Sequence, residues 1–267
     1  MSAPTQVRLP SSTSNLGPGF DLLGLCLDLY LTVEFSCDDS GEMLDRFAEM
    51  GGQAAGLPQG PENLVLRAFH ALHAHEGRPV PSGRLWSMGS QIPVARGLGS
   101  SGAATAAGLL LACQALDIDP EAHQDTLIQL GTRLEGHPDN VVASLLGGCV
   151  LTVQSSPSFR VIRQEIHPDL AFAVAWGNTP LPTALARKNL PTQVPFEQAL
   201  DQPRRLVALL EGLRTADPML LRHARTEHLH EHARLPLIPG GAEALAAAHE
   251  AGAYLATISG SGSSLVA

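Results

Sequence analysis

The chain has 267 residues, 44% of them hydrophobic and 16% charged, a composition typical of a globular protein with a sizeable core. Its net charge of −9 argues against binding to nucleic acid, because phosphate backbones attract basic surfaces. The four cysteines are scattered along the chain, so we expect neither a disulfide framework nor a zinc knuckle. The chain starts without an apolar segment and has no apolar run of about 20 residues, so we expect neither a signal peptide nor a membrane span. We therefore expect a cytoplasmic protein.

Hydrophobic periodicity predicts strands and helices in alternation through the first part of the chain. Strands are predicted over 27–35, 84–92 and 148–154, and helices over 62–76, 103–116 and 120–136. The first helix is expected to end at Gly77 and the last at Gly136, because glycine is common just after a helix. Asp119 and Pro120 are residue types that favour the N-cap and the first turn of a helix.

A polar segment at 155–158 is the best candidate for a boundary between two parts of the chain. We therefore predict an N-terminal lobe at 1–156 and a C-terminal lobe at 157–267. In the second lobe, strands are predicted over 170–176 and 254–258, and helices over 204–214, 218–233 and 242–251. This order of elements predicts an α+β fold in two lobes.

A loop rich in glycine and serine at 93–102 (PVARGLGSSG) joins a predicted strand to a predicted helix. Glycines let a ligand approach the backbone, and N–H groups at a helix start attract anions, so the loop predicts a phosphate site. The plain alternative is an ordinary glycine-rich turn. Gly97, Gly99 and Gly102 also match the dinucleotide-binding pattern, with Asp117 downstream, but no predicted strand precedes that aspartate as the pattern requires. The loop also lacks the Gly-Lys-Ser/Thr ending of a Walker A motif.

Three segments, in this order, resemble the motifs of the GHMP kinases, the family that includes galactokinase and mevalonate kinase. They are residues 10–21 (PSSTSNLGPGFD), 93–102 and 259–264 (SGSGSS). Within that family, further segments resemble the homoserine kinases, namely 15–21, 135–140, 182–191, 230–234 and 238–240. The resemblance therefore covers essentially the whole chain.

The resemblance implies a GHMP kinase fold, with an N-terminal lobe like ribosomal protein S5 domain 2, a ferredoxin-like C-terminal lobe, and ATP and Mg²⁺ bound between them. It implies phosphorylation of the side-chain hydroxyl of L-homoserine to O-phospho-L-homoserine, on the route to threonine, by a homodimer. The chain ends at Ala267, sooner after the third motif than the family pattern, so we expect either that a terminal strand and helix are missing or that this is a truncated form. Two alternatives stay open: a GHMP kinase for another small alcohol, such as mevalonate or a sugar, and a non-catalytic ligand-binding member.

The nucleotide site is expected in the glycine–serine loop. Gly97, Gly99, Ser100 and Ser101 are expected at the β- and γ-phosphates, beside the positive end of the following helix. The residues predicted to bind the nucleotide are Pro93, Arg96, Gly97, Leu98, Gly99, Ser100, Ser101, Gly102 and Ala103, with Asn63 at the adenine. Ser101 and Glu135 are the predicted Mg²⁺ ligands, because a hard cation prefers oxygen.

The resemblance to homoserine kinases places Asn140 where other family members have an aspartate base. An amide cannot take up a proton at neutral pH. We therefore predict that Asn140 orients the hydroxyl and that the proton passes to the γ-phosphate, with Ser101 and Glu135 completing the catalytic set. Homoserine carries both charges, and Arg187 and Arg234 are predicted to bind its carboxylate. Its ammonium group is assigned to Asn15, Asp21 and Asp139, with His137 as a polar contact.

A histidine-rich segment at 223–232 places His228 and His232 four residues apart, a spacing that could put two metal ligands on one helical face. No third ligand is evident, so a solvated helix face is the favoured interpretation. A serine hydrolase is disfavoured, because the sequence contains no G-x-S-x-G nucleophile elbow.

Overall fold

The computed structural model describes residues 5–37, 46–80, 84–155 and 158–267. Its larger sheet has the strand order β3-β4-β2-β5-β6, with β1 paired to β2. These strands are β1 (Thr5–Asn15), β2 (Gly19–Cys37), β3 (Arg46–Gly52), β4 (Arg84–Ser90), β5 (Cys149–Ser155) and β6 (Ser158–Gln164). All neighbouring pairs are antiparallel except β3 with β4.

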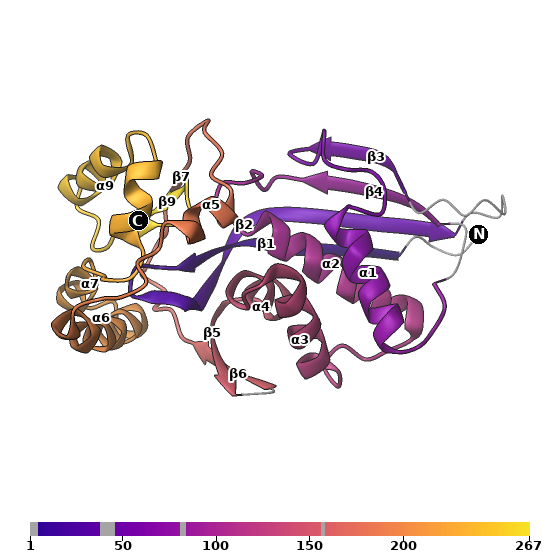
Figure 1. Ribbon diagram of the computed structural model, residues 1–267, viewed down its shortest axis with the longest axis horizontal. Coiled ribbons are helices and arrows are strands. Elements are labelled where there is room, and N and C mark those ends of the chain that lie inside the picture. Colours follow the sequence, from indigo (N-terminus) through magenta and orange to yellow (C-terminus); the bar gives the residue numbers. More distant parts are fainter. Residues whose placement is uncertain (1–4, 38–45, 81–83, 156–157) are drawn as a thin grey trace.

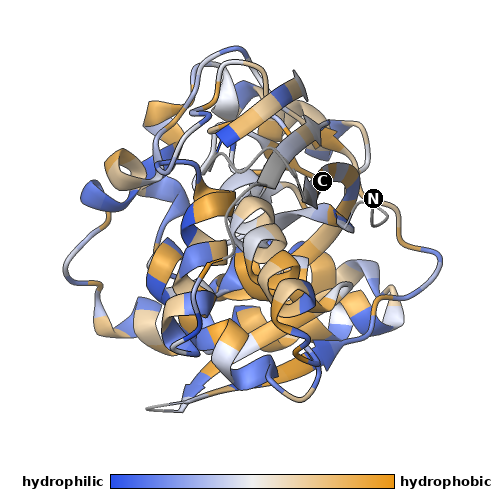
Figure 2. Ribbon diagram, turned by 90° about the vertical axis from the view of Figure 1, so that its right-hand side faces the viewer, coloured by the Kyte–Doolittle hydropathy of each residue, from blue (hydrophilic) through white to orange (hydrophobic). Residues whose placement is uncertain are grey.

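Four helices cover one face of this sheet (Figure 1). They are α1 (Leu64–His75), α2 (Ser100–Leu116), α3 (Gln124–Glu135) and α4 (Asp139–Leu146). The small residues of α2 let it pack closely against α1, since a Cβ on Gly108 would lie 2.1 Å from the Val65 carbonyl oxygen. Apolar side chains of the sheet and of α1 to α4 form one buried cluster, and Figure 2 shows hydrophobic residues along the helices in the middle of the molecule.

The C-terminal lobe lies at one end of the large sheet (Figure 1). It contains a small antiparallel sheet in the order β7-β9-β8. Its elements are β7 (Val174–Ala175), α5 (Thr183–Lys188), α6 (Phe196–Thr215), α7 (Pro218–His223), α8 (Glu231–Arg234), the 3₁₀ turn η1 (Leu235–Leu237), α9 (Gly241–Glu250), β8 (Thr257–Ile258) and β9 (Leu265–Val266). Leu209 and Leu221 of this lobe pack in one cluster with Leu23 and Leu151 of the large sheet, which joins the two lobes.

The predicted lobe boundary lies next to a pair of neighbouring strands, β5 and β6. β6 pairs with β5 from Ser155↔Ser158 to Cys149↔Gln164, so the division at 156/157 falls inside a hairpin of the large sheet. Phe159 and Val161 of β6 also pack on the core of the first lobe. Strand β6, which ends at Gln164, therefore belongs to the large sheet. Residues 156 and 157 themselves lie outside the described residues.

Several predicted elements differ in length from the observed ones. The prediction of a helix from 120 is wrong, because Asp119 accepts the Glu121 N–H at 3.0 Å and forms a turn, so that α3 begins at Gln124. The predicted helix over 218–233 is broken into α7 and α8. The predicted strands over 170–176 and 254–258 shrink to two residues each, because their partner β9 is itself only Leu265–Val266.

No helix in the described part of the chain combines the length and the apolar character that crossing a membrane requires.

Candidate active site

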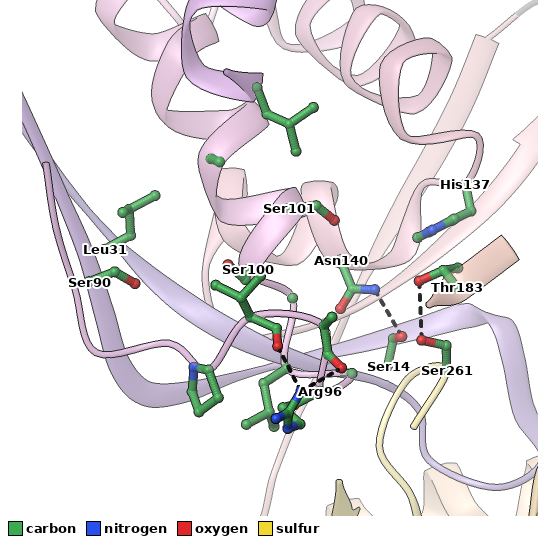
Figure 3. A pocket seen from close by; sticks show the side chains of 18 of the residues that line it. Ser14, Leu31, Ser90, Arg96, Ser100, Ser101, His137, Asn140, Thr183 and Ser261 are labelled. Carbon is green, nitrogen blue, oxygen red and sulfur yellow. Dashed lines mark hydrogen bonds between the residues drawn. The ribbon is translucent and has the colours of Figure 1, made fainter. Parts of the chain in front are cut away.

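A cavity of about 410 Å³ lies between the lobes, beside the start of α2. Most residues predicted from the sequence line it (Figure 3). They are Asn15, Asp21, Asn63, Pro93, Arg96, Gly97, Leu98, Gly99, Ser100, Ser101, His137, Asp139, Asn140, Arg187 and Arg234. Gly102, Ala103 and Glu135 are the predicted site residues that do not line it. Segments far apart in the sequence therefore meet around one cavity.

The glycines of the loop are required by contacts between protein segments. Gly97 has φ +73°, and a Cβ there would lie 2.1 Å from the Ser259 carbonyl oxygen. Gly99 has φ +69°, and its Cβ would lie 2.2 Å from Ser12 Oγ. The loop is also held by the Ser259 hydroxyl, which donates to the Gly97 carbonyl at 2.7 Å. The first and third sequence motifs thus pack directly against the second, which fixes the backbone that faces the cavity.

The start of α2 has the features of an anion site. The helix begins at Ser100, three residues before the predicted start, and its N-cap Gly99 makes no side-chain cap hydrogen bond. The first N–H groups of a helix have no acceptor within the helix, and the helix dipole adds partial positive charge there. Ser100 and Ser101 line the cavity at this point. The residues present therefore fit phosphate oxygens.

An oxygen-rich cluster lies next to this helix start. Ser101 Oγ donates to Glu135 Oε2 at 2.6 Å, and Thr105 Oγ1 donates to Glu135 Oε1 at 2.7 Å. Glu135 is the last residue of α3, followed by Gly136 at φ +83°. A carboxylate with two hydroxyls is a donor set that suits Mg²⁺, so the pair predicted from the sequence is brought together.

Asn140 is held rigidly at the start of α4. Its Oδ1 accepts from Ser12 Oγ at 2.9 Å, and its Nδ2 donates to Ser14 Oγ at 3.1 Å. The side chain reaches the cavity between Ser14 and His137 (Figure 3). Because these contacts fix which amide atom points where, Asn140 can orient a ligand hydroxyl.

Asp139 and His137 form a buried pair. His137 Nδ1 lies 2.6 Å from Asp139 Oδ1, and Asp139 is 1% exposed. Burial alone would raise the pKa of Asp139, but the hydrogen bond and charge of His137 bring it below its usual value. Burial would lower the pKa of His137, yet its bond to Asp139 raises it. The same oxygen also accepts the Asn140 N–H, so Asp139 Oδ1 is held by protein groups while the residue lines the cavity.

Asp21 and Arg187 bind each other across the lobes. Two guanidinium nitrogens donate to the two carboxylate oxygens at 2.9 and 2.7 Å. The backbone of Asp21 is in the left-handed region at φ +53°, and its N–H donates to Asn15 Oδ1 at 3.0 Å. The bond to Asp21 raises the pKa of Arg187. Two residues predicted for opposite ends of a zwitterion are thus paired with one another.

Arg234 differs from Arg187 in its surroundings. It is 1% exposed, and its Nη1 donates to the Gly260 carbonyl at 2.9 Å. Burial lowers its pKa, but a guanidinium stays charged at neutral pH. It supplies a fixed positive charge to the wall of the cavity.

Two residues beside Asn140 were missed by the sequence interpretation. Ser12 and Ser14 hold Asn140 and belong to the run Ser11–Asn15, which is buried throughout although every side chain is polar. Such a run in a strand is itself a signal for a site. Asn63, predicted at the adenine, lines the cavity and also caps α1, because its Oδ1 accepts the Val65 N–H and its Nδ2 donates to the Pro58 carbonyl.

The histidine-rich segment does not form the solvated helix face that we favoured. Glu227 accepts the N–H groups of Leu229 and His230, which stops one helix from running through the segment. His230 is fully buried, and His228 pairs with Asp201 at 2.9 Å. A cluster of three or more His, Cys, Asp or Glu suited to a metal ion is absent from the described part of the chain.

Comparison with known proteins agrees with the resemblance seen in the sequence. Residues 63–148 match the family model described as GHMP kinases N terminal domain, and residues 208–267 match GHMP kinases C terminal. The chain is 40% identical to a homoserine kinase of Moorella thermoacetica, over 98% of this chain and 86% of the relative. It is 42% identical to a homoserine kinase of Prochlorococcus marinus, over 98% and 82%.

Solved structures give the same picture. A homoserine kinase from Cytophaga hutchinsonii superposes with a TM-score of 0.86 at 29% identity, over 100% of this chain and 85% of that one. A phosphomevalonate kinase from Streptococcus pneumoniae superposes with a TM-score of 0.68 at 14% identity, over 99% and 91%. At that identity the second likeness concerns the fold alone.

Proposed function

The chain belongs to the GHMP kinase family, whose members use ATP, and from that premise we propose that it phosphorylates the side-chain hydroxyl of L-homoserine to give O-phospho-L-homoserine, a step toward threonine. One observation carries the proposal. The phosphate-type helix start at Ser100 and the charged residues Asp21, Arg187 and Arg234 face the same cavity. Such a cavity can hold a nucleotide and a small zwitterion together, and the similar proteins named homoserine kinase make homoserine the first choice.

The nucleotide half would act by position and charge. We propose that the N–H groups at the start of α2 and the hydroxyls of Ser100 and Ser101 bind the β- and γ-phosphates. Ser101 and Glu135 would hold Mg²⁺, which neutralises charge that develops on the phosphate oxygens. Phosphoryl transfer needs little covalent chemistry from the protein, so fixing the γ-phosphate next to the acceptor provides most of the rate.

The acceptor half would hold both charged groups of the amino acid. Arg234 and Arg187 would bind the α-carboxylate, and Asp21 with Asn15 would receive the ammonium group. The present Asp21–Arg187 pair must then open far enough for the substrate to lie between its charges. The substrate would replace the single Asp21–Arg187 ion pair by two, one to its ammonium group and one to its carboxylate. These new ion pairs would offset the free-energy cost of breaking the original pair.

Asn140 is proposed to orient the acceptor hydroxyl toward the γ-phosphate. The proton would pass to a phosphate oxygen, since an amide cannot accept it. Asn140→Asp removes the amide donor to Ser14 and adds a charge beside Asp139, so kcat should fall by about 10- to 100-fold. An unchanged kcat and pH profile in that variant would exclude a special orienting role.

The substrate assignment is tested by ADP release with Mg-ATP and a panel of homoserine, mevalonate, galactose and shikimate. The proposal predicts turnover with L-homoserine well above that of the other acceptors. Turnover with a non-amino-acid alcohol, and none with homoserine, would assign another small alcohol. ATP binding without ADP release for any acceptor would point to a non-catalytic member.

Three further features belong to this proposal. We propose that the protein works in the cytoplasm, as a homodimer, and without nucleic acid. The net charge of −9 supports the last point, and the free, unpaired Cys26, Cys113 and Cys149 are compatible with a reducing compartment. Light scattering at micromolar concentration measures the oligomer directly.

A further inference from the structure

His230 lies behind the acceptor side of the cavity, in the fully buried interior of the C-terminal lobe. Its Nε2 is 3.0 Å from the Gly17 carbonyl oxygen. A carbonyl can only accept, so Nε2 must carry the hydrogen. In a neutral imidazole, Nδ1 is then an acceptor, and it lies 3.4 Å from Nη1 of Arg234.

The surroundings keep this ring neutral. Burial, with a smaller contribution from the charge of Arg234, lowers the pKa of His230 to about 4, although Glu227 acts in the opposite direction. The ring also stacks on Phe20, with centroids 5.0 Å apart. A protonated ring would turn an N–H toward the Arg234 guanidinium, so the neutral form is the one that fits.

The contacts of Arg234 divide its guanidinium into two edges. Nη1 has two hydrogens, one directed to Gly260 at 2.9 Å and one to His230. Nε is buried and has no hydrogen-bond partner within the described residues. The Nε–Nη2 edge is one of the edges through which a guanidinium can bind a carboxylate with two parallel hydrogen bonds, and within the described residues no acceptor is bonded to it.

We propose that His230 is a positioning residue for the acceptor: together with the Gly260 carbonyl it occupies Nη1 of Arg234, and so directs the free Nε–Nη2 edge to the α-carboxylate of the substrate. The inference rests on the proposed function, because it assumes that the acceptor is an α-amino acid. His230 does not line the cavity. The proposal therefore adds a residue outside the cavity wall to those that determine which acceptor is bound.

Two matched variants distinguish the roles of the two ring nitrogens of His230. His230→Asn keeps an acceptor oxygen near the place of Nδ1, and His230→Gln keeps an amide donor near the place of Nε2. The second substrate is 3-aminopropan-1-ol, which is homoserine without its carboxylate. The proposal predicts that His230→Gln raises the homoserine KM by roughly 10- to 100-fold, while His230→Asn stays within about 3-fold of the unchanged protein. For 3-aminopropan-1-ol and for ATP, kcat/KM should change little in either variant.

Equal losses in both variants, or equal losses with both acceptors, would overturn the positioning role and leave a purely structural one. Failure of the unchanged protein to turn over homoserine would contradict the proposed function instead. A measurement on the unchanged protein is independent of turnover: ¹⁵N NMR of the His230 ring at pH 7. It should show a protonated Nε2 and an unprotonated Nδ1. A proton on Nδ1 would overturn the inference whatever the substrate.

Discussion

The two halves of the cavity are formed by different groups, a loop backbone in one half and charged side chains in the other. On the proposed phosphate side, residues 97–101 line the cavity and are fixed by contacts such as Gly97 with Ser259 and Gly99 with Ser12. On the proposed acceptor side, charged side chains line the cavity and are fixed by ion pairs and hydrogen bonds, as between Asp21 and Arg187. We infer that the phosphate half tolerates no added side chain, whereas the acceptor half can change its ligand through single charges.

Gly97→Ala is expected to have the largest effect. Its Cβ would meet the Ser259 backbone at 2.1 Å with φ at +73°, so the loop must move. We expect a loss of at least about 100-fold in kcat/KM for ATP and a destabilisation of about 3 kcal/mol or more. Steady-state kinetics and urea unfolding measure the two quantities.

Gly77 provides the matched control for that variant. It also has positive φ, at +62°, but a Cβ there would meet nothing within 4 Å. Gly77→Ala should cost only about 1 kcal/mol and leave the kinetics unchanged. Equal effects at both positions would show that backbone conformation alone, rather than contact with the third motif, makes Gly97 necessary.

Asp21→Ala tests the acceptor half. Removing the carboxylate should raise the homoserine KM by about 10- to 100-fold, because both the ammonium contact and the alignment of Arg187 are lost. The KM for ATP should stay nearly constant. Asp169→Ala, at a carboxylate that is 84% exposed, is the control. A loss of ATP affinity in Asp21→Ala would contradict the separation of the two halves.

Glu135→Gln tests the cation on the phosphate side. The neutral amide keeps an acceptor for Ser101 or Thr105 but loses the charge that attracts Mg²⁺. The Mg²⁺ concentration for half-maximal rate should rise by about 10-fold, without a change in the homoserine KM. Glu121→Gln, at an exposed residue outside the cavity, should leave both values as they were. An unchanged Mg²⁺ dependence in Glu135→Gln would remove this residue from the metal site.

The smallest expected effect is the pH dependence of stability that arises from two titratable residues, Glu231 and His230, near the acceptor half of the cavity. Burial raises the pKa of Glu231 to about 7, above its value in the unfolded chain. The folded state therefore holds this proton more tightly, and the related stability is present below pH 4.5 and lost as the pH rises through 7. His230, with its lowered pKa, acts oppositely: its stability is lost as the pH falls below 6.5 toward 4.

Glu231→Gln isolates the first of these contributions. It removes the titration, so its unfolding free energy relative to the unchanged protein should increase by about 1 to 3 kcal/mol between pH 5 and pH 7.5. Urea unfolding at the two pH values measures the difference. A constant difference between the two proteins would show that Glu231 titrates with its ordinary pKa.

The local structure of the proposed phosphate half can be predicted from the sequence more readily than the contacts of the proposed acceptor half, for a physical reason. A glycine–serine loop between a strand and a helix is a local pattern, and α2 confirms it with a start at Ser100. The Asp21–Arg187 pair joins residues 166 positions apart, which no local pattern encodes. Only the resemblance to a family placed these two residues in one site.

The errors in the fold have a similar origin. The segment 155–158 is polar, and Ser155 pairs with Ser158 between β5 and β6, whereas the same polar composition also suits a linker between lobes. The segment 218–233 has helical periodicity, but the side chain of Glu227 takes up backbone N–H groups within it. A capping side chain in the middle of a periodic run is a tertiary feature that periodicity does not reveal.

Transfer of label from γ-³²P-ATP to L-homoserine tests the central claim most directly. If nucleotide and acceptor share the cavity as described, one labelled phosphohomoserine should form for each ADP released, and phosphate should not appear in the medium. Labelled inorganic phosphate in place of phosphohomoserine, or label on a different alcohol only, would contradict the account.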